Sequence, residues 1–143
     1  MTQREMTELT GPERRRLAIL EKRYRNAARV QFEARVAYYH GITGGNYTSV
    51  TIRDQKSRWG SCSSRGTLSF NYRLIFAPPA ILDYVVVHEL CHLTHMNHSK
   101  DFWNMVASVM PEYKLHRTWL REHGHELTLE NHLDRLGIPV TLD

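Results

Sequence analysis

The sequence of 143 residues contains little cysteine and no apolar run long enough to span a membrane. Its longest apolar stretch, residues 81–87, is interrupted by Asp83, whereas a transmembrane helix needs about 20 predominantly apolar residues. The two cysteines, Cys62 and Cys91, are too few for a disulfide scaffold and do not form a C-x-x-C motif. Each is more simply explained as a small buried side chain. We therefore expect neither a membrane-spanning nor a disulfide-rich protein.

The N-terminal sequence also lacks the apolar segment of a secretory signal peptide. It reads MTQREMTELTGPERRR, with charges where that segment would lie. The composition, 41% hydrophobic and 24% charged residues, is typical of a globular protein, and the length suits one domain. We expect a single cytoplasmic domain over residues 1–143, without membrane contact, made of a basic N-terminal helix (1–45), a core (46–124) and a C-terminal tail (125–143).

The net charge of +4 is concentrated in the first third of the chain. Residues 1–45 contain nine Lys or Arg and five Asp or Glu, whereas residues 46–143 contain ten of each kind. A basic helix can bind nucleic-acid phosphates by releasing counter-ions, although most basic helical faces are simply solvated. A DNA contact through the N-terminal helix is therefore an alternative to a solvated surface.

A long helix is predicted from Gly11 and Pro12, because proline suits the first turn of a helix. Apolar residues recur at helical spacing along it and should pack on the rest of the domain, namely Leu17, Leu20, Tyr24, Ala27 and Ala28. Three glycines predict where the helix ends: Gly41, Gly44 and Gly45.

The pattern then changes to the period of two that is typical of strands. The segments YTSVTIRD and TLSFNYRLIF alternate apolar and polar residues, and SRWGSCSSRG between them carries the serines and glycines of turns. We predict a small antiparallel sheet with strands at about residues 48–54, 57–62 and 67–73.

Helices are predicted over most of the remaining chain, so the fold class is α+β. The first should begin at Pro79, where the missing proline N–H costs least, and extend to His95 or Met96. The others follow at about 99–109 with Ser99 as N-cap, at 112–123 before Gly124, and at 128–136.

The sequence HELCHLTHMNH, residues 88–98, contains four histidines and one glutamate. Residues four apart share one face of a helix, so His88 and His92 can bind one metal ion. Glu89 points to the side of that ion and can act as a base on a water molecule there, which is the chemistry of the H-E-x-x-H motif. A helix with solvated or buried histidines is the alternative, but three ligand positions beside a base favour a metal site.

A catalytic zinc ion needs a third protein ligand and an open position for water. His95 would lie roughly 10 Å along the helix axis from His88, which is too far to bridge with zinc–nitrogen bonds of about 2 Å. His98 becomes available if the chain turns back after about Met96, and Asn97 tolerates the left-handed conformation that such a turn could need. We therefore predict one zinc ion bound by His88, His92 and His98.

Three patterns, RWGSC, FN-x-RL and HELCH-x5-HS-x-x-FW, occur in this order between about residues 46 and 124. In these segments the chain resembles the YgjP-like family of zinc metallopeptidases, which is distantly similar to the SprT and WLM metalloproteases. The resemblance implies a minimal zincin-like fold, in which the sheet and additional helices pack on the HExxH active-site helix. It also implies His88, His92 and His98 as zinc ligands and Glu89 as the catalytic acid and base.

Two features depart from related patterns. Members of the family often carry an additional β-rich region before the core, whereas a basic helix precedes it here. His95 stands where the metzincin proteases, with the same histidine spacing, have glycine, so other residues must make the turn.

Endoribonucleases of ribosome maturation space their histidines similarly but resemble H-G-x-x-H, and Glu89 favours hydrolysis at a carbonyl over RNA cleavage.

We predict a zinc metallopeptidase, a hydrolase of protein or peptide substrates in which Glu89 activates water and then protonates the departing amine. One alternative is a nucleic-acid-binding module with a structural zinc, for which His95 or Cys91 would be the fourth ligand. The others are a protease recruited to DNA by its N-terminal helix and a zinc hydrolase of small non-peptide amides. Glu89 favours the protease, because a structural site needs no base.

The residues that bind substrate are unknown from the sequence. Either Arg58 and Trp59 line a cleft beside an edge strand that binds an extended peptide, or Trp59 fills the core and Gly60 permits a bulge. Asp101 and Asn71 are candidates for orienting a ligand histidine. An oxyanion stabiliser can be suggested by residue type alone, from Arg58, Tyr72, Arg73, Tyr113 and Arg117.

Overall fold

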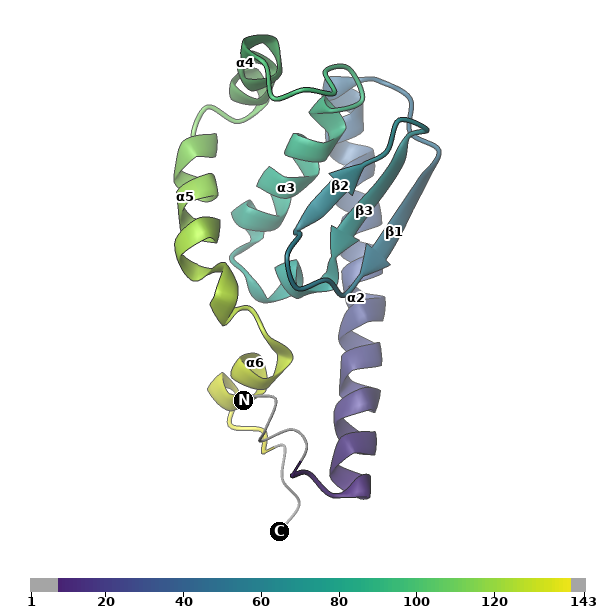
Figure 1. The fold of residues 1–143 in the computed structure, drawn as a ribbon, viewed down its shortest axis with the longest axis vertical. Coiled ribbons are helices and arrows are strands. Elements are labelled where there is room, and N and C mark those ends of the chain that lie inside the picture. Colours follow the sequence, from purple (N-terminus) through teal and green to yellow (C-terminus); the bar gives the residue numbers. More distant parts are fainter. Residues whose placement is uncertain (1–7, 140–143) are drawn as a thin grey trace.

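The computed structural model describes residues 8–139. The first seven residues of the predicted N-terminal segment and the last four of the predicted tail lie outside the described residues. The described chain confirms the α+β class (Figure 1) and contains, in order, α2 (Gly11–Thr43), β1 (Ser49–Arg53), β2 (Gly60–Cys62), β3 (Thr67–Asn71), the 3-10 helix η1 (Tyr72–Phe76), α3 (Pro79–Cys91), α4 (Lys100–Val109), α5 (Tyr113–His123), the 3-10 helix η2 (Gly124–Glu126) and α6 (Leu129–Arg135).

Helix α2 begins with a capping box encoded by the sequence T-x-x-E. The Thr10 hydroxyl accepts a hydrogen bond from the Glu13 N–H (3.2 Å), and the Glu13 carboxylate accepts one from the Thr10 N–H (2.9 Å). The helix continues through Gly41 and ends before Gly44, whose φ of 69° is a conformation that glycine adopts readily. Of the three glycines predicted to end the helix, Gly44 is therefore the one that does so.

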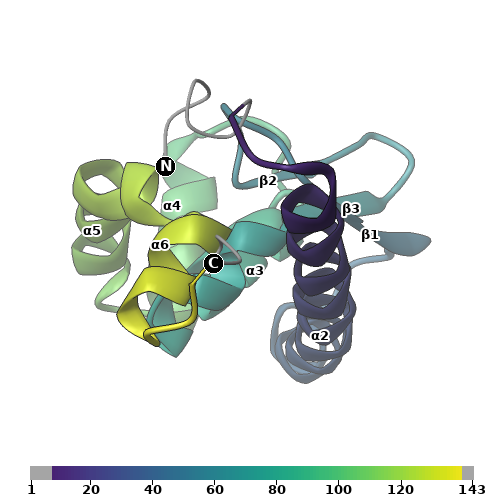
Figure 2. The same cartoon turned by 90° about the horizontal axis from the view of Figure 1, so that it is seen from below.

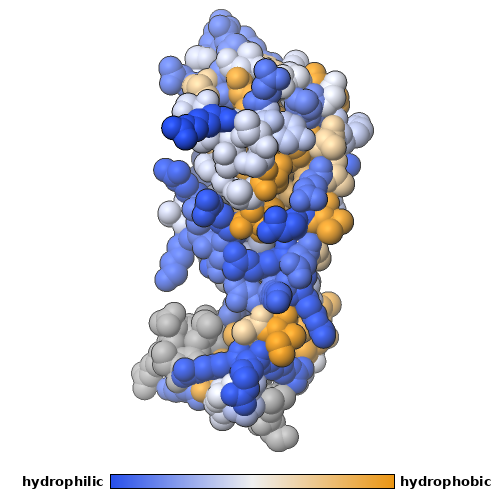
Figure 3. Space-filling model, turned by 90° about the vertical axis from the view of Figure 1, so that its right-hand side faces the viewer, coloured by the Kyte–Doolittle hydropathy of each residue, from blue (hydrophilic) through white to orange (hydrophobic). Residues whose placement is uncertain are grey.

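One face of α2 packs on the sheet and on η1. Most of the apolar residues that we predicted to pack on the domain lie on this face. Ala27 is exposed, and the fully buried Phe32 and Val36 extend the contact instead. The Phe32 ring stacks on Phe70 of β3 with the ring centroids 4.7 Å apart. The side of the molecule that includes α2 and β1 is largely hydrophilic, with separate apolar patches (Figure 3).

The sheet is mixed, so the prediction of an antiparallel sheet was wrong. Strand β3 lies in the centre, parallel to β1 and antiparallel to β2. The tight turn at 63–66 makes β2 and β3 neighbours, and residues 54–59 cross the end of β3 to connect β1 with β2. Asn71 holds this crossover, because its side-chain amide donates hydrogen bonds to the carbonyls of Gln55 (2.6 Å) and Arg58 (3.0 Å). Alternating polar and apolar residues predict where strands lie along the chain but not which strands are adjacent in the sheet.

Two predicted strands extended too far. Strand β2 begins at Gly60 rather than at residue 57, because the preceding residues belong to the crossover. Strand β3 ends at Asn71 rather than at residue 73, because the Asn71 side-chain oxygen accepts a hydrogen bond from the Arg73 N–H (3.1 Å) and so begins η1.

Helix α3 is apolar on nearly all sides and lies at the centre of the fold. It contacts α2, α4, α5 and β2, and Figures 1 and 2 show α2 and α5 on opposite sides of it. A helix that is apolar all round is stable only when buried, and most of its residues are buried here. At 13 residues it is short, and none of the helices between residues 8 and 139 is long and apolar enough to cross a membrane.

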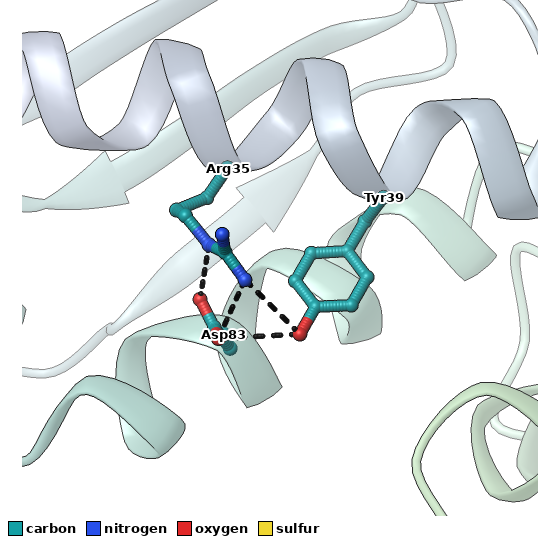
Figure 4. A network of polar contacts seen from close by, with 3 residues as sticks. All are labelled: Arg35, Tyr39 and Asp83. Atoms are coloured by element: carbon teal, nitrogen blue, oxygen red, sulfur yellow. Dashed lines mark hydrogen bonds and ion pairs between the residues drawn. The ribbon is translucent and has the colours of Figure 1, made fainter.

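One polar network joins α2 to α3 (Figure 4). The Arg35 guanidinium donates hydrogen bonds to both carboxylate oxygens of Asp83, at 2.8 and 3.0 Å, and the Tyr39 hydroxyl donates to Asp83 at 3.2 Å. Such a two-pronged ion pair has defined geometry as well as charge attraction. The network therefore fixes the orientation of α3, the helix that carries the H-E-x-x-H sequence.

We expect Asp83→Asn to lower the free energy of unfolding by about 1 kcal/mol, because the substitution leaves the Arg35 guanidinium without its charged partner while both groups remain partly hydrated. Urea denaturation measures this change. Glu21→Gln is the control: it removes the more exposed pair with Arg25 (3.8 Å) and should change stability by less than about 0.5 kcal/mol. Equal stability of Asp83→Asn and wild type would show that the network does not stabilise the fold.

Candidate metal centre and catalytic cleft

Helix α3 ends at Cys91, not at His95 or Met96 as predicted. The N–H groups of residues 92–95 bond to the carbonyls of Glu89, Leu90 and Cys91 at 3.0–3.2 Å, mostly three residues back, which winds the chain into tight turns. No non-glycine residue between 8 and 139 has a positive φ, so Asn97 does not adopt the left-handed conformation that we expected. The tight turns reverse the chain instead.

This reversal brings His88, His92 and His98 together. The Nε2 atom of His98 lies 3.2 Å from that of His92 and 3.3 Å from that of His88. Zinc–nitrogen bonds of about 2.0–2.1 Å in a tetrahedral arrangement would separate two ligand nitrogens by roughly 3.3 Å. His92 is buried, His88 is half-buried and His98 is exposed. The three donors therefore fit one zinc ion that solvent can reach from the side of His98.

Two hydrogen-bond partners orient the inner histidines. The Nδ1 atom of His92 lies 2.9 Å from the carbonyl oxygen of His95, which accepts a hydrogen bond from Nδ1–H and leaves Nε2 free to bind metal. The Tyr84 hydroxyl lies 3.4 Å from Nδ1 of His88. Tyr84 was not among the predicted site residues, although its position one turn before His88 on the same helix face was a usable signal.

The two residues predicted for this orienting role do something else. Asn71 holds the crossover between β1 and β2. Asp101 is exposed in the first turn of α4, where its charge favours the helix N-terminus. Ser99 caps that helix as predicted, because its hydroxyl accepts a hydrogen bond from the Phe102 N–H (3.3 Å).

The surroundings keep the inner histidines neutral. Burial, followed by the neighbouring His92 and His98, lowers the pKa of His88 to about 3. Burial also lowers the pKa of His92, although the bond to the His95 carbonyl opposes that shift. Metal binding requires neutral imidazole, so the lowered pKa values of His88 and His92 favour the forms that can bind a metal ion.

The cluster has three members, which argues against a closed structural site with four ligands. Within residues 8–139 no fourth histidine, cysteine or carboxylate joins His88, His92 and His98. Cys91 is fully buried, and burial raises the pKa of its thiol to about 12. His95 contributes its carbonyl group rather than its ring. A zinc ion held by these three residues alone would keep one coordination position for water or substrate.

Glu89 lies beside the histidines and under strand β2. Its side chain is only 5% exposed, and burial raises its pKa to about 8 against the opposing charge of Arg58. A Cβ atom at Gly60 would lie 3.0 Å from a carboxylate oxygen of Glu89 and 3.0 Å from Val85. Gly60 pairs regularly with Phe70, so it permits this close approach and not the predicted bulge.

A cleft of about 290 Å³ opens beside the histidines, lined by Trp59, Gly60, Tyr84, Val85, His88, Glu89, Arg117, Leu120 and Arg121. Trp59 combines both predicted roles, since it lines the cleft and also packs where a side chain at Gly124 would otherwise lie. Its partners from α5, Leu120 and Arg121, gave no signal in the sequence.

Of the five candidate oxyanion stabilisers, only Arg117 lines the cleft. Arg73 forms an ion pair with Asp54 (2.8 Å), Tyr72 is buried against Phe76 of η1, and the Tyr113 ring stacks on Trp103. Arg58 acts on the site through its charge near Glu89.

Two solved structures have a similar fold. The metallopeptidase zymogen abylysin of Pyrococcus abyssi is 26% identical, with a TM-score of 0.56, and the match covers 63% of this chain and 93% of abylysin. The metallopeptidase zymogen jannalysin of Methanocaldococcus jannaschii is 22% identical and supports the fold alone, with a TM-score of 0.51 over 59% of this chain and 90% of jannalysin. No curated protein has significant sequence similarity to the chain.

Residues 2–123 match the family described as YgjP-like, metallopeptidase domain. The sequence motifs that resemble this family lie within residues 46–124, whereas the match begins at residue 2 and includes α2. The N-terminal helix is therefore part of the matched domain. These findings confirm a metal-dependent peptidase and give no support to a DNA contact. The chain belongs to the YgjP-like metallopeptidase family.

Proposed function

We propose that this metallopeptidase hydrolyses peptide bonds of protein or peptide substrates with one zinc ion, held by His88, His92 and His98, and with Glu89 as general base and acid. The convergence of the three Nε2 atoms, with His88 and Glu89 lining one open cleft, carries the proposal. A bound zinc ion supplies Lewis acidity, which lowers the pKa of water and polarises a carbonyl oxygen.

Glu89 accepts a proton from the attacking water and delivers it to the departing amine nitrogen. Burial favours the protonated carboxyl group and raises its pKa to about 8, which suits the second of these steps. The positive charge of Arg58, together with any cation held by the histidines, favours the ionised form that the first step needs. These opposing influences let one carboxyl group serve both steps.

Strand β2 offers the substrate a main-chain partner. Among the described residues it pairs with no strand other than β3, so no described strand occupies its other edge, and its first residue, Gly60, lines the cleft with Trp59. An extended peptide that adds to this edge by main-chain hydrogen bonds would lie beside Glu89. The proposal places the enzyme in the cytoplasm, and the two free cysteines, Cys62 and Cys91, agree with a reducing compartment.

Protein purified without added metal should contain close to one zinc ion per chain, measured by plasma mass spectrometry. His98→Ala should lose the ion, because two protein ligands remain. His95→Ala is the matched control and should keep it, since only the main-chain carbonyl of His95 contacts a ligand. Zinc retained by His98→Ala, or lost equally from both variants, would contradict the proposed ligand set.

Glu89→Gln should retain zinc but cleave a quenched fluorescent peptide about 10²- to 10⁴-fold more slowly than wild type, because the amide cannot accept the proton of water. Glu122→Gln makes the same change at an exposed position on α5 and should cleave at the wild-type rate. A Glu89→Gln protein that cleaves as fast as wild type would exclude Glu89 as the base.

A further inference from the structure

We infer that the cleft beside Glu89 binds a carboxylate group of the substrate through Arg117 and Arg121, so that the enzyme cleaves next to an acidic side chain or a free C-terminus. The inference rests on the proposed function, because it concerns the substrate of the same site. It follows from the position of the two arginines, from the absence of an acidic partner for them within the described part of the chain, and from the other residues that line the cleft.

Both arginines face the catalytic residues from one helix. Arg117 and Arg121 lie four residues apart on α5, so their side chains occupy the same helix face one turn apart. Both line the cleft that His88 and Glu89 also line. Helix α5 runs beside α3 in Figures 1 and 2, which places this face along the length of the site.

Stacking holds the Arg117 guanidinium in place. Its central carbon lies 4.8 Å from the centre of the Trp103 ring, and Trp103 in turn stacks on Tyr113 and on the ligand His98. A guanidinium that lies on an aromatic face keeps its N–H groups directed outward at its edge. Arg117 is therefore held by the same aromatic residue that supports a metal ligand, with its donors available.

Neither arginine has a counter-ion among the residues that the structure describes. Within residues 8–139, no carboxylate forms an ion pair with Arg117 or Arg121. Other arginines do have such partners: Arg35 pairs with Asp83 and Arg73 with Asp54. Among residues 8–139, Glu89 is the only acidic residue that lines the cleft. The cleft thus carries two positive charges that a substrate anion can neutralise.

The other residues that line the cleft favour a substrate group with a short apolar chain that ends in a negative charge. Trp59, Val85 and Leu120 supply apolar surface within a volume of about 290 Å³, which suits one side chain rather than a long segment. The planar fork of arginine matches the two oxygens of a carboxylate. A peptide presents that group either as an aspartate or glutamate side chain or as its terminal α-carboxylate.

The test measures binding separately from cleavage. Zinc-loaded Glu89→Gln protein is titrated in a calorimeter with four unlabelled peptides of one neutral sequence with acetylated N-termini. Three end in an amide and carry Glu, Gln or Lys at the centre, and the fourth carries central Gln and a free C-terminal carboxylate. We expect a carboxylate-bearing peptide to bind about tenfold or more tightly than the Gln amide, and the Lys peptide to bind most weakly.

Arginine substitutions identify the residues responsible. Arg117→Gln and Arg121→Gln, each added to Glu89→Gln, should each reduce the preference for carboxylate, and together they should abolish it. Lys114→Gln is the matched control, because it removes one positive charge from the same helix at an exposed residue outside the cleft. This control variant should keep the full preference.

The peptides also distinguish the two sources of the carboxylate. Preference for the Glu amide supports recognition of an acidic side chain, and preference for the free C-terminus supports recognition of the chain end. Equal binding of all four peptides, or a preference that survives both arginine substitutions, overturns the inference, and the proposed function stands if wild type cleaves these peptides. If a carboxylate strengthens binding but wild type cleaves none of the peptides, the inferred binding site is supported and the proposed function is overturned.

Discussion

The geometry of the site depends on the end of α3 immediately before its second histidine. In a continuous helix, His98 would lie about 15 Å along the axis from His88, because each residue rises about 1.5 Å. The tight turns that begin at His92 instead fold the chain back, so that the third imidazole meets the first two. The same turns place the carbonyl group that orients His92. One local change of backbone conformation thus supplies both a ligand and its support.

The chemistry of the site is set by the layers around α3 as much as by the site residues. Helix α2 carries no proposed ligand or catalytic group, yet its Arg35 and its buried apolar face hold α3 against the sheet. Exclusion of water from α3 keeps His88 uncharged and favours a proton on Glu89. At the two residues themselves, the contacts come from neighbouring elements, with Gly60 of β2 against Glu89 and Phe102 of α4 against His88.

The sequence predicted those features that depend on near neighbours along the chain. The metal cluster lies within residues 88–98, and the proline and serine signals predicted where α3 and α4 begin. Features that depend on distant segments were not predictable. The direction of β1 relative to β3 follows from a crossover held by Asn71, and the cleft forms only where α5 and β2 meet α3. Arg121 had no local pattern to distinguish it from any other exposed arginine.

The contact between Gly60 and Glu89 couples two segments that are far apart in sequence. A Cβ atom at position 60 would lie 3.0 Å from the Glu89 carboxyl group, so a side chain there would require the carboxyl group or the strand to shift slightly. In a related chain with a larger residue at this position, the acid would have to move or the strand would have to shift. The size of the residue at the position of Gly60 is therefore one steric criterion for an HExxH helix in this fold. It indicates whether the glutamate of that helix has room to occupy a catalytic position.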